Sequence, residues 1–395
     1  MSGRRLARFR ARVAGVVAGA QPAPWASSAH AALLELERDG AAPLAGQRPA
    51  AGGPLSIAIV IPSFRRGSGG HATIAHLVRG LQARGNDVSL WLEDYQRRHI
   101  EESEAETARR FEEFFTPGDV RLHKDWTAWS GADVVVATDW VTVSRVLLLG
   151  GAGARAYLVQ DHEADFYGAS AEALWAAQTY RRGLHCIAAS RWLADLLADR
   201  YGASATHFDL GVDHDTYRPP TGRRRDDLVV FYARAVTARR AVPLGLLALS
   251  ELARRRPTLD IALYGDATAP GAPFAHRQLG VLDSASLAEL YCEATVGMAL
   301  SLTNSSLICL EMMAAGLPCV ELASESMRAT FGDDGPLELA APDPLALCAA
   351  LERLLDAPEV RLGMSRGGIE LMRERTWERA ARQVEDGLRV LCRSR

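Results

Sequence analysis

Three arginines stand at positions suited to binding phosphate. Arg234 directly follows the apolar run 228–233, and Arg239 and Arg240 follow in the same expected loop. Guanidinium groups remain charged and bind phosphate oxygens in pairs. Because a solvated position is unnatural directly after an apolar strand, the spacing favours a diphosphate site. A solvated basic loop is the alternative.

Glu311 is the only charged residue in the segment 299–320. A lone carboxylate in apolar surroundings is unfavourable unless it has polar partners. Asn304, Ser305 and Ser306 precede it and are typical of a helix start, where backbone N–H groups are free. These features predict a nucleotide site, with phosphate at the helix start and a sugar hydroxyl on Glu311. An exposed helix edge is the alternative.

The segment 67–71 reads G-S-G-G-H and lies between an expected strand and an expected helix. Glycines such as Gly69 and Gly70 let a ligand approach the backbone, and a helix start favours an anion. The motif is not G-x-G-x-x-G, so a dinucleotide site is disfavoured. A plain turn between strand and helix is the alternative.

Two further polar segments follow expected strands or join the halves of the chain. The segment 160–163 reads Q-D-H-E and would serve an acceptor hydroxyl through Asp161, with ordinary loop polarity as the alternative. The segment 213–215 reads D-H-D, a pattern that can hold a divalent metal. Its place between the two halves favours a turn over a metal site.

Apolar strands alternate with helical patterns along most of the chain. The series starts at 56–61, pauses near 210–226 and restarts at 228–233. This alternation predicts two α/β units, each with a parallel sheet covered by helices on both faces. Ligands of such sheets bind beyond the carboxyl ends of the strands, where the residues described above fall.

Length and composition agree with this organisation. A chain of 395 residues fits two or three domains, and 48% hydrophobic residues supply their cores. The net charge of −3 excludes a nucleic-acid partner by bulk charge. Six cysteines without a C-x-x-C pair favour a reducing compartment. No apolar run reaches the ~18 residues of a membrane span.

The segment 1–54 differs from the rest of the chain. Its first twelve residues hold five arginines and no acid, and a stretch rich in Pro, Gly and Ala follows. A basic helix on an anionic membrane surface is one interpretation. A flexible or loosely docked extension is the other.

The stretch YARAVTARR resembles the diphosphate loop G-R-x-x-x-x-K-G, with Arg239 in place of the Lys. LSLTNSSLICLEMMAAGLPCV resembles the signature S-x-x-E-G-F-G-L-x-x-x-E-A-M-A-x-G-x-P-V-V, with Glu311 on its second Glu. LGVDHDTYRP resembles the interdomain segment N-G-V-D-x-x-x-F-x-P, and Gly69 and Gly70 fall on a glycine pair of the first domain. Over about residues 55–390, the chain resembles the GT-B glycosyltransferases of the large retaining family four.

This resemblance implies a GT-B fold, with two Rossmann-like doubly wound domains facing a central cleft. It implies an acceptor-side domain at 55–212, a nucleotide-sugar domain at 213–375 and a helix at 376–395 that returns to the first domain. It also implies a retaining transfer from a nucleotide-sugar donor to a glycan or lipid-linked saccharide, without a metal or other cofactor. The site residues expected under this hypothesis are Arg234, Arg239, Glu311 and Asp161 in catalysis, and Gly69, Gly70, Arg240, Gly265, Asp266, Leu282, Thr303, Asn304, Ser305, Ser306 and Leu307 in donor binding.

One departure concerns the first Glu of the signature, which is Thr303 in this chain. In the family that Glu faces the donor sugar, so its replacement by Thr303 leaves the identity of the donor sugar open. The strings F-Y-A-R, Q-D-x-E-x-x-F-Y and S-L-T-N-x-S-L are similar to a narrower branch of bacterial rhamnosyltransferases. This similarity implies dTDP-rhamnose as donor, synthesis of surface glycans and a cytoplasmic location, at the inner face of the plasma membrane if the basic segment binds lipid. A nucleotide-sugar epimerase and a noncatalytic carbohydrate-binding subunit remain alternatives.

Overall fold

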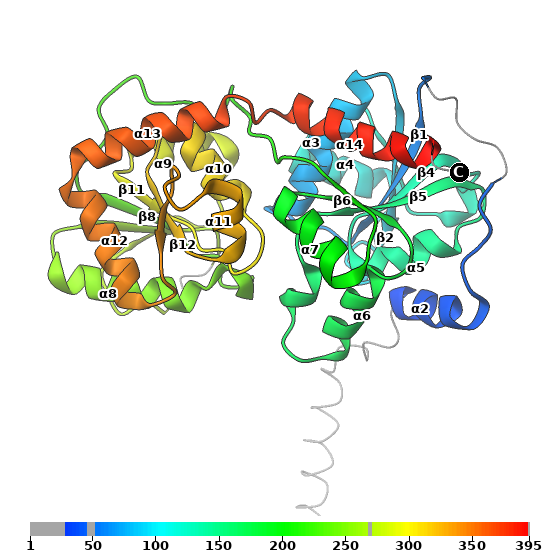
Figure 1. Cartoon of the computed structure of the whole chain (residues 1–395), viewed down its shortest axis with the longest axis horizontal. Coiled ribbons are helices and arrows are strands. Elements are labelled where there is room, and N and C mark those ends of the chain that lie inside the picture. The colour runs from blue at the N-terminus through cyan, green and yellow to red at the C-terminus, as the bar shows by residue number, and fades with distance from the viewer. Residues whose placement is uncertain (1–27, 46–51, 268–270, 394–395) are drawn as a thin grey trace, which may run out of the picture.

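The computed structural model describes residues 28–45, 52–267 and 271–393. The five arginines of the first twelve residues lie outside the described residues, and with them the predicted membrane contact. The described chain forms two α/β domains that lie side by side (Figure 1).

The first domain is built on a seven-stranded sheet in which every neighbouring pair is parallel. Its strand order is β3-β2-β1-β4-β5-β6-β7. The central strands are apolar and buried on both faces, as in Ser56–Pro62, because helices cover the sheet on each side. The strands are β1 (Ser56–Pro62), β2 (Asp87–Glu93), β3 (Arg121–His123), β4 (Ala132–Ala137), β5 (Ala152–Val159), β6 (His185–Ala188) and β7 (Ala205–His207).

The helices of this domain begin at residues that cap them. Ser103 and Asp139 form capping boxes at the starts of two helices, so their side chains accept hydrogen bonds from otherwise free backbone N–H groups. The helices are α2 (Ser28–Asp39), α3 (Gly69–Ala83), α4 (Glu104–Phe115), α5 (Trp140–Leu148), α6 (Ala171–Thr179) and α7 (Arg191–Tyr201).

The second domain repeats the plan with a six-stranded parallel sheet in the order β10-β9-β8-β11-β12-β13. Its strands are β8 (Leu228–Tyr232), β9 (Asp260–Tyr264), β10 (Arg277–Gln278), β11 (Val296–Met298), β12 (Cys319–Leu322) and β13 (Glu338–Ala340). Its helices are α8 (Val242–Arg255), α9 (Ser284–Glu293), α10 (Leu307–Ala314), α11 (Glu325–Phe331), α12 (Pro344–Asp356) and α13 (Pro358–Met372).

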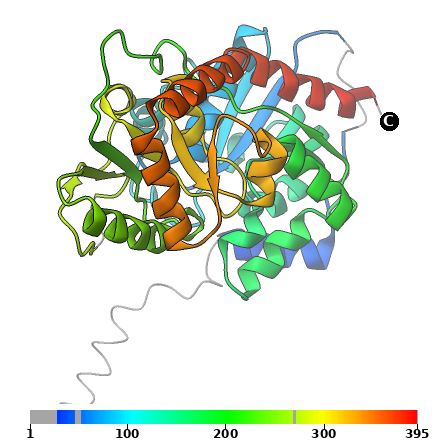
Figure 2. The ribbon, with the colours of Figure 1, turned by 60° about the vertical axis from the view of Figure 1, so that its left-hand side comes forward.

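The last helix, α14 (Trp377–Arg393), leaves the second domain and packs across α3 of the first (Figures 1 and 2). The approach is close, because a Cβ added at Gly80 would lie 2.4 Å from the Cβ of Ala381. Beside this crossing, the backbone N–H of Val212 donates to the carbonyl of Arg375 at 2.9 Å. The chain therefore passes between the domains twice, at neighbouring points.

Helix α2 differs from the flexible extension that the sequence predicts for this region. Ala29, Ala32 and Leu36 are buried, and the helix packs against α5. The small and aliphatic side chains at these three positions form one face of the helix, and that face covers the first domain. Among the residues that the structure describes, no helix is both long and apolar enough to cross a membrane.

Candidate functional site

A cleft of about 650 Å³ lies between the two domains. Loops that follow β1, β2, β4 and β5 line it from the first domain, and loops that follow β8, β10 and β11 line it from the second. In both sheets these are the carboxyl ends of parallel strands, where backbone and side-chain groups are free to meet a ligand.

Arg234 reaches from the second domain to the glycine segment of the first. Its Nη1 donates to the carbonyl oxygen of Gly67 at 3.0 Å. Gly67 has φ +75°, and a Cβ there would come within 3.2 Å of the same Nη1. Glycine at this position therefore lets the guanidinium approach the backbone while Arg234 lines the cleft.

Arg239 forms an ion pair with Asp161, with its Nε 3.1 Å from the Asp161 Oδ2. The guanidinium carbon also lies 3.9 Å from the centre of the Phe166 ring. Burial lowers the pKa of Arg239 from its usual value, and the Asp161 carboxylate opposes that change. Both charged residues line the cleft, one from each domain.

Arg240 also lines the cleft and is held from behind. Its Nη1 donates to the Ser301 hydroxyl at 2.7 Å. The backbone N–H of Ser301 in turn donates to the fully buried Glu321 carboxylate at 3.1 Å. Burial raises the pKa of Glu321 to about 7. These two hydrogen bonds hold the Arg240 side chain in the wall of the cleft.

Thr303 and Asn304 do not line the cleft, in contrast to their predicted place in donor binding. The Thr303 hydroxyl donates to Asp161 Oδ2 at 2.9 Å, and the Asn304 N–H donates to Asp161 Oδ1 at 3.0 Å. The Asn304 side-chain amide donates to the carbonyls of Gln160 and Ala189. Both residues are buried because they join the domains behind the cleft.

The start of α10 supplies the polar groups that the sequence predicts there. Ser305, Ser306 and Leu307 line the cleft. Ser306 precedes the helix without a side-chain cap, and its buried Oγ has no hydrogen-bond partner among the described residues. The first N–H groups of α10 and this hydroxyl are therefore available to an anion.

Glu311 lies on the same helix and also lines the cleft. Its Oε2 is buried and has no hydrogen-bond partner within the described part of the chain. Burial raises the pKa of Glu311 to about 8, and the Tyr217 hydroxyl opposes that change. An unpartnered buried carboxyl oxygen is costly unless a ligand supplies a hydrogen bond, so Glu311 is suited to bind a hydroxyl group.

Gly69, Gly70 and Leu282 line the cleft as expected of donor-site residues, whereas Gly265 and Asp266 do not. Gly265 adopts φ +101°, and a Cβ there would lie 2.5 Å from the Tyr232 ring. Its role in the structure is to let the chain turn against that ring. The carbonyl of Asp266 accepts a hydrogen bond from Gln278.

Two further acids line the cleft, Asp139 and Glu163, and of these only Glu163 lies in a segment that sequence analysis singled out. Burial raises the pKa of Asp139 to about 6, and it raises the pKa of Glu163 well above its ordinary value. Glu163 accepts hydrogen bonds from the Trp140 N–H and the Tyr157 hydroxyl, both at 2.6 Å. Asp139 is recognisable in sequence as a helix cap after β4, but that pattern alone gives no sign of a binding role.

The segment 213–215 forms a local turn. The Asp213 carboxylate accepts hydrogen bonds from the Asp215 N–H and the Thr216 hydroxyl. Within the described ranges there is no group of three or more His, Cys, Asp or Glu arranged to hold a metal ion.

Comparison with known proteins gives partial matches in sequence. A family model described as "WsaF, C-terminal domain" matches residues 227–352. The O-antigen biosynthesis protein RfbC of Myxococcus xanthus is 29% identical over 275 residues, which is 68% of this chain and 22% of the relative. The D-inositol 3-phosphate glycosyltransferase of Frankia alni is 31% identical over 221 residues, or 48% of this chain and 54% of the relative. The chain thus spans about a fifth and about half of these two proteins.

Comparison of structures covers most of the chain. Sucrose-phosphate synthase from Thermosynechococcus elongatus matches with a TM-score of 0.65 at 17% identity, over 85% of this chain and 98% of the other. Anabaena HepE, solved in complex with UDP-glucose, matches with a TM-score of 0.63 at 13% identity, over 85% of this chain and all of the other. The chain therefore has the GT-B fold of glycosyltransferases, and the predicted fold class is confirmed.

Proposed function

We propose that the protein is a glycosyltransferase that moves a sugar from a nucleoside diphosphate to a hydroxyl group of a glycan or glycolipid. The observation that carries the proposal is the meeting of three arginines with the start of α10 and Glu311 in one interdomain cleft. Cations suit a diphosphate, and an unpartnered carboxyl oxygen suits a sugar hydroxyl.

In the proposed reaction the chain stabilises the leaving diphosphate. Arg234, Arg239 and Arg240 supply positive charge, and the N–H groups at Ser306 and Leu307 supply hydrogen bonds. Such groups lower the barrier because they are already oriented where negative charge develops. This arrangement needs no metal to neutralise the diphosphate. Glu311 would accept a hydrogen bond from the (deoxy)ribose of the donor.

Closure of the cleft around the donor would protect the donor from hydrolysis. Asp161 receives hydrogen bonds from Thr303 and from the Asn304 backbone across the domain boundary, and it pairs with Arg239. Contacts of this kind hold the domains together and keep water from the reacting centre. Retention of the anomeric configuration is the finer part of the proposal and follows from the motif resemblance.

The narrower proposal is transfer of rhamnose from dTDP-rhamnose during bacterial surface-polysaccharide synthesis. The rhamnosyl assignment rests on the sequence strings around Thr303 and Asp161. The name of RfbC, an O-antigen biosynthesis protein, supports a role in surface glycans. HepE, crystallised with UDP-glucose, supports use of a nucleotide sugar by this fold. A cytoplasmic location, peripheral at the inner membrane face, completes the proposal.

The proposal is tested by thermal unfolding with a panel of nucleoside diphosphates and their sugars, in the presence of EDTA. A ligand that binds the folded state raises stability by about 2.7 kcal/mol at a hundredfold excess over its dissociation constant. Stabilisation by dTDP alone supports the rhamnosyl assignment, and preference for UDP or GDP keeps the transferase and discards rhamnose.

Product analysis then separates the remaining alternatives. Transfer to a saccharide panel, with the linkage determined by NMR, supports the transferase and reads out retention directly. Conversion of the donor sugar without an acceptor would identify an epimerase. Absence of any nucleotide response would leave the noncatalytic carbohydrate-binding alternative.

A further inference from the structure

A second group of arginines lines the cleft on the side of the first domain. Arg65 and Arg66 follow β1, and Arg98 lies in the loop after β2. Within the described residues, none of the three side chains forms an ion pair with a carboxylate. Arginines of the other domain would bind the proposed donor diphosphate. Donor binding therefore does not explain why Arg65, Arg66 and Arg98 line the cleft.

Arg65 lies within electrostatic range of two other arginines. Burial lowers the pKa of Arg65, and the nearby charges of Arg234 and Arg98 lower it further. The charge of Asp266 acts in the opposite direction, although no ion pair joins it to Arg65 in the part of the chain that the structure describes. Three guanidinium groups without a paired carboxylate repel one another, and an anion between them would relieve that repulsion.

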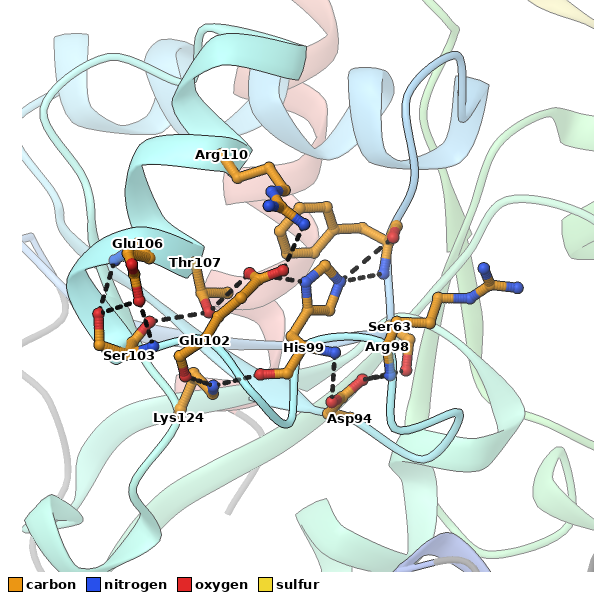
Figure 3. Close-up of polar contacts among 11 residues, drawn as sticks. Ser63, Asp94, Arg98, His99, Glu102, Ser103, Glu106, Thr107, Arg110 and Lys124 are labelled. Carbon is orange, nitrogen blue, oxygen red and sulfur yellow. Dashed lines mark hydrogen bonds and ion pairs between the residues drawn. The ribbon is translucent and has the colours of Figure 1, made fainter. Parts of the chain in front are cut away.

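The loop that carries Arg98 is firmly built. The Asp94 carboxylate accepts hydrogen bonds from the Ser63 hydroxyl at 2.7 Å, the Arg98 N–H at 3.0 Å and the His99 N–H at 2.9 Å (Figure 3). The His99 ring stacks on Phe64 with centroids 4.0 Å apart. These contacts join the loop after β2 to the loop after β1. The backbone at Arg65 and the backbone at Arg98 are therefore held relative to each other.

The hydrogen bonds around this loop do not engage the charge of the Arg98 guanidinium with a carboxylate. Lys124 donates to the carbonyls of His99 and Glu102, and Glu102 pairs with Arg110. Figure 3 shows the Arg98 guanidinium pointing away from this network. Its Nε donates to the neutral Gln96. The network therefore uses its carboxylates internally and leaves the positive charge of Arg98 uncompensated.

We infer that Arg65 and Arg98 bind a phosphate or diphosphate group carried by the acceptor, beside the donor diphosphate site at Arg234. The inference rests on the proposed function, because it concerns the second substrate of the same cleft. It assigns an anionic acceptor, either a soluble sugar phosphate or a saccharide linked to lipid through diphosphate. Two guanidinium groups carried on loops that are joined to each other suit either source.

The first test measures binding without turnover. Protein saturated with the nucleoside diphosphate that stabilises it most is titrated with inorganic pyrophosphate at constant ionic strength, and the thermal unfolding midpoint is recorded. Wild type should gain a further stabilisation. Arg98→Gln should lose this gain and keep the response to the nucleoside diphosphate. Arg121→Gln, at an exposed arginine paired with Asp87, is the matched control and should keep both responses.

The second test measures transfer to three forms of one acceptor sugar: the methyl glycoside, the 1-phosphate and the prenyl diphosphate. Arg98→Gln should raise KM for the phosphorylated forms by about tenfold or more, with the donor KM within about twofold of wild type. The effect should be absent for the methyl glycoside. A lower wild-type KM for the 1-phosphate than for the prenyl diphosphate indicates a soluble source, and the reverse order indicates a lipid-linked one.

The outcomes separate this inference from the proposed function. If Arg98→Gln keeps the pyrophosphate response, or if it weakens donor and acceptor equally, the acceptor assignment is wrong while the transferase stands. If no nucleoside diphosphate binds and no sugar is transferred, the proposed function is wrong. Pyrophosphate stabilisation that is lost in Arg98→Gln would then still establish the anion site.

Discussion

The Nε of Arg239 lies 3.1 Å from Oδ2 of Asp161, and this ion pair joins the two domains inside the cleft. The same carboxylate accepts hydrogen bonds from Thr303 and Asn304, so a single acid receives three groups of the second domain. A residue that sequence analysis assigned to catalysis therefore also joins the two domains.

Replacement of Asp161 by alanine should open the unliganded protein. The variant loses the acceptor for Thr303, Asn304 and Arg239 and leaves a largely buried guanidinium without its partner. We expect a larger radius of gyration by small-angle X-ray scattering, and weaker donor binding. Asp195→Ala, at an exposed acid paired with Arg191, is the control. Identical scattering of Asp161→Ala and wild type would contradict the fastening role.

Replacement of Arg234 by alanine should lower turnover with the fold intact. Removal of one oriented donor to a developing anion costs about 10²–10³ in kcat. Steady-state kinetics measures the turnover, and the thermal unfolding midpoint shows whether the fold is intact. Arg254→Ala, in an exposed pair with Glu251 on the same domain, should change neither, because such pairs contribute little. Normal turnover in Arg234→Ala would remove this residue from the site.

The Thr303 hydroxyl should contribute to stability rather than to the choice of donor. Thr303→Val keeps the shape but removes a hydrogen bond to a buried carboxylate, at a cost of about 1–3 kcal/mol. Thr303→Ser keeps the hydroxyl and should stay close to wild type. Denaturant unfolding measures both variants. A change of donor preference in Thr303→Val without loss of stability would instead indicate direct contact with the sugar.

The pKa of about 8 at Glu311 predicts a pH-dependent penalty on folding. The unfolded side chain loses its proton near pH 4.5, whereas the folded one holds it to about pH 8. Between these values the folded state binds more protons, so stability falls as pH rises, by at most about 1.4 kcal/mol per pH unit. Below pH ~4 the group contributes nothing, and above the folded pKa the full penalty is present.

Replacement of Glu311 by glutamine removes this titration. The variant should match wild type in unfolding free energy near pH 4 and exceed it by a growing margin up to pH 9. Comparison of the two proteins at each pH cancels the contribution of the other acids. Its donor KM should rise, because the carboxyl oxygen that faces the cleft is changed. Parallel stability curves across this range would show that Glu311 titrates normally.

The strand and helix pattern and much of the cleft could be predicted from the sequence. Apolar strands with period-two or fully buried patterns, followed by capped helices, carry local signals. Arg234 stands out because it directly follows an apolar run, and Glu311 stands out because it is the only charged residue in its segment. The structure places both in the cleft. Residues that follow the carboxyl ends of parallel strands lie at the same edge of the sheet, whatever path the connecting loops take.

Contacts between the domains carry no such local signal. The pairing of Thr303 and Asn304 with Asp161 depends on how the two sheets face each other, which no periodicity records. The burial of α2 on α5 was missed because its apolar face holds only small residues and one leucine, within a segment that is otherwise rich in Pro and Gly. Asp139 was missed because its place before a helix is already explained by capping, and the sequence gives no separate sign that it lines the cleft.

The path of the chain into α14 has a consequence for synthesis on the ribosome. The helix that covers α3 of the first domain is the last described element to be made. During translation the first domain must therefore wait, with that apolar face uncovered, until the whole second domain has left the exit tunnel. The first domain is therefore completed after the second, although its coding sequence comes first in the message.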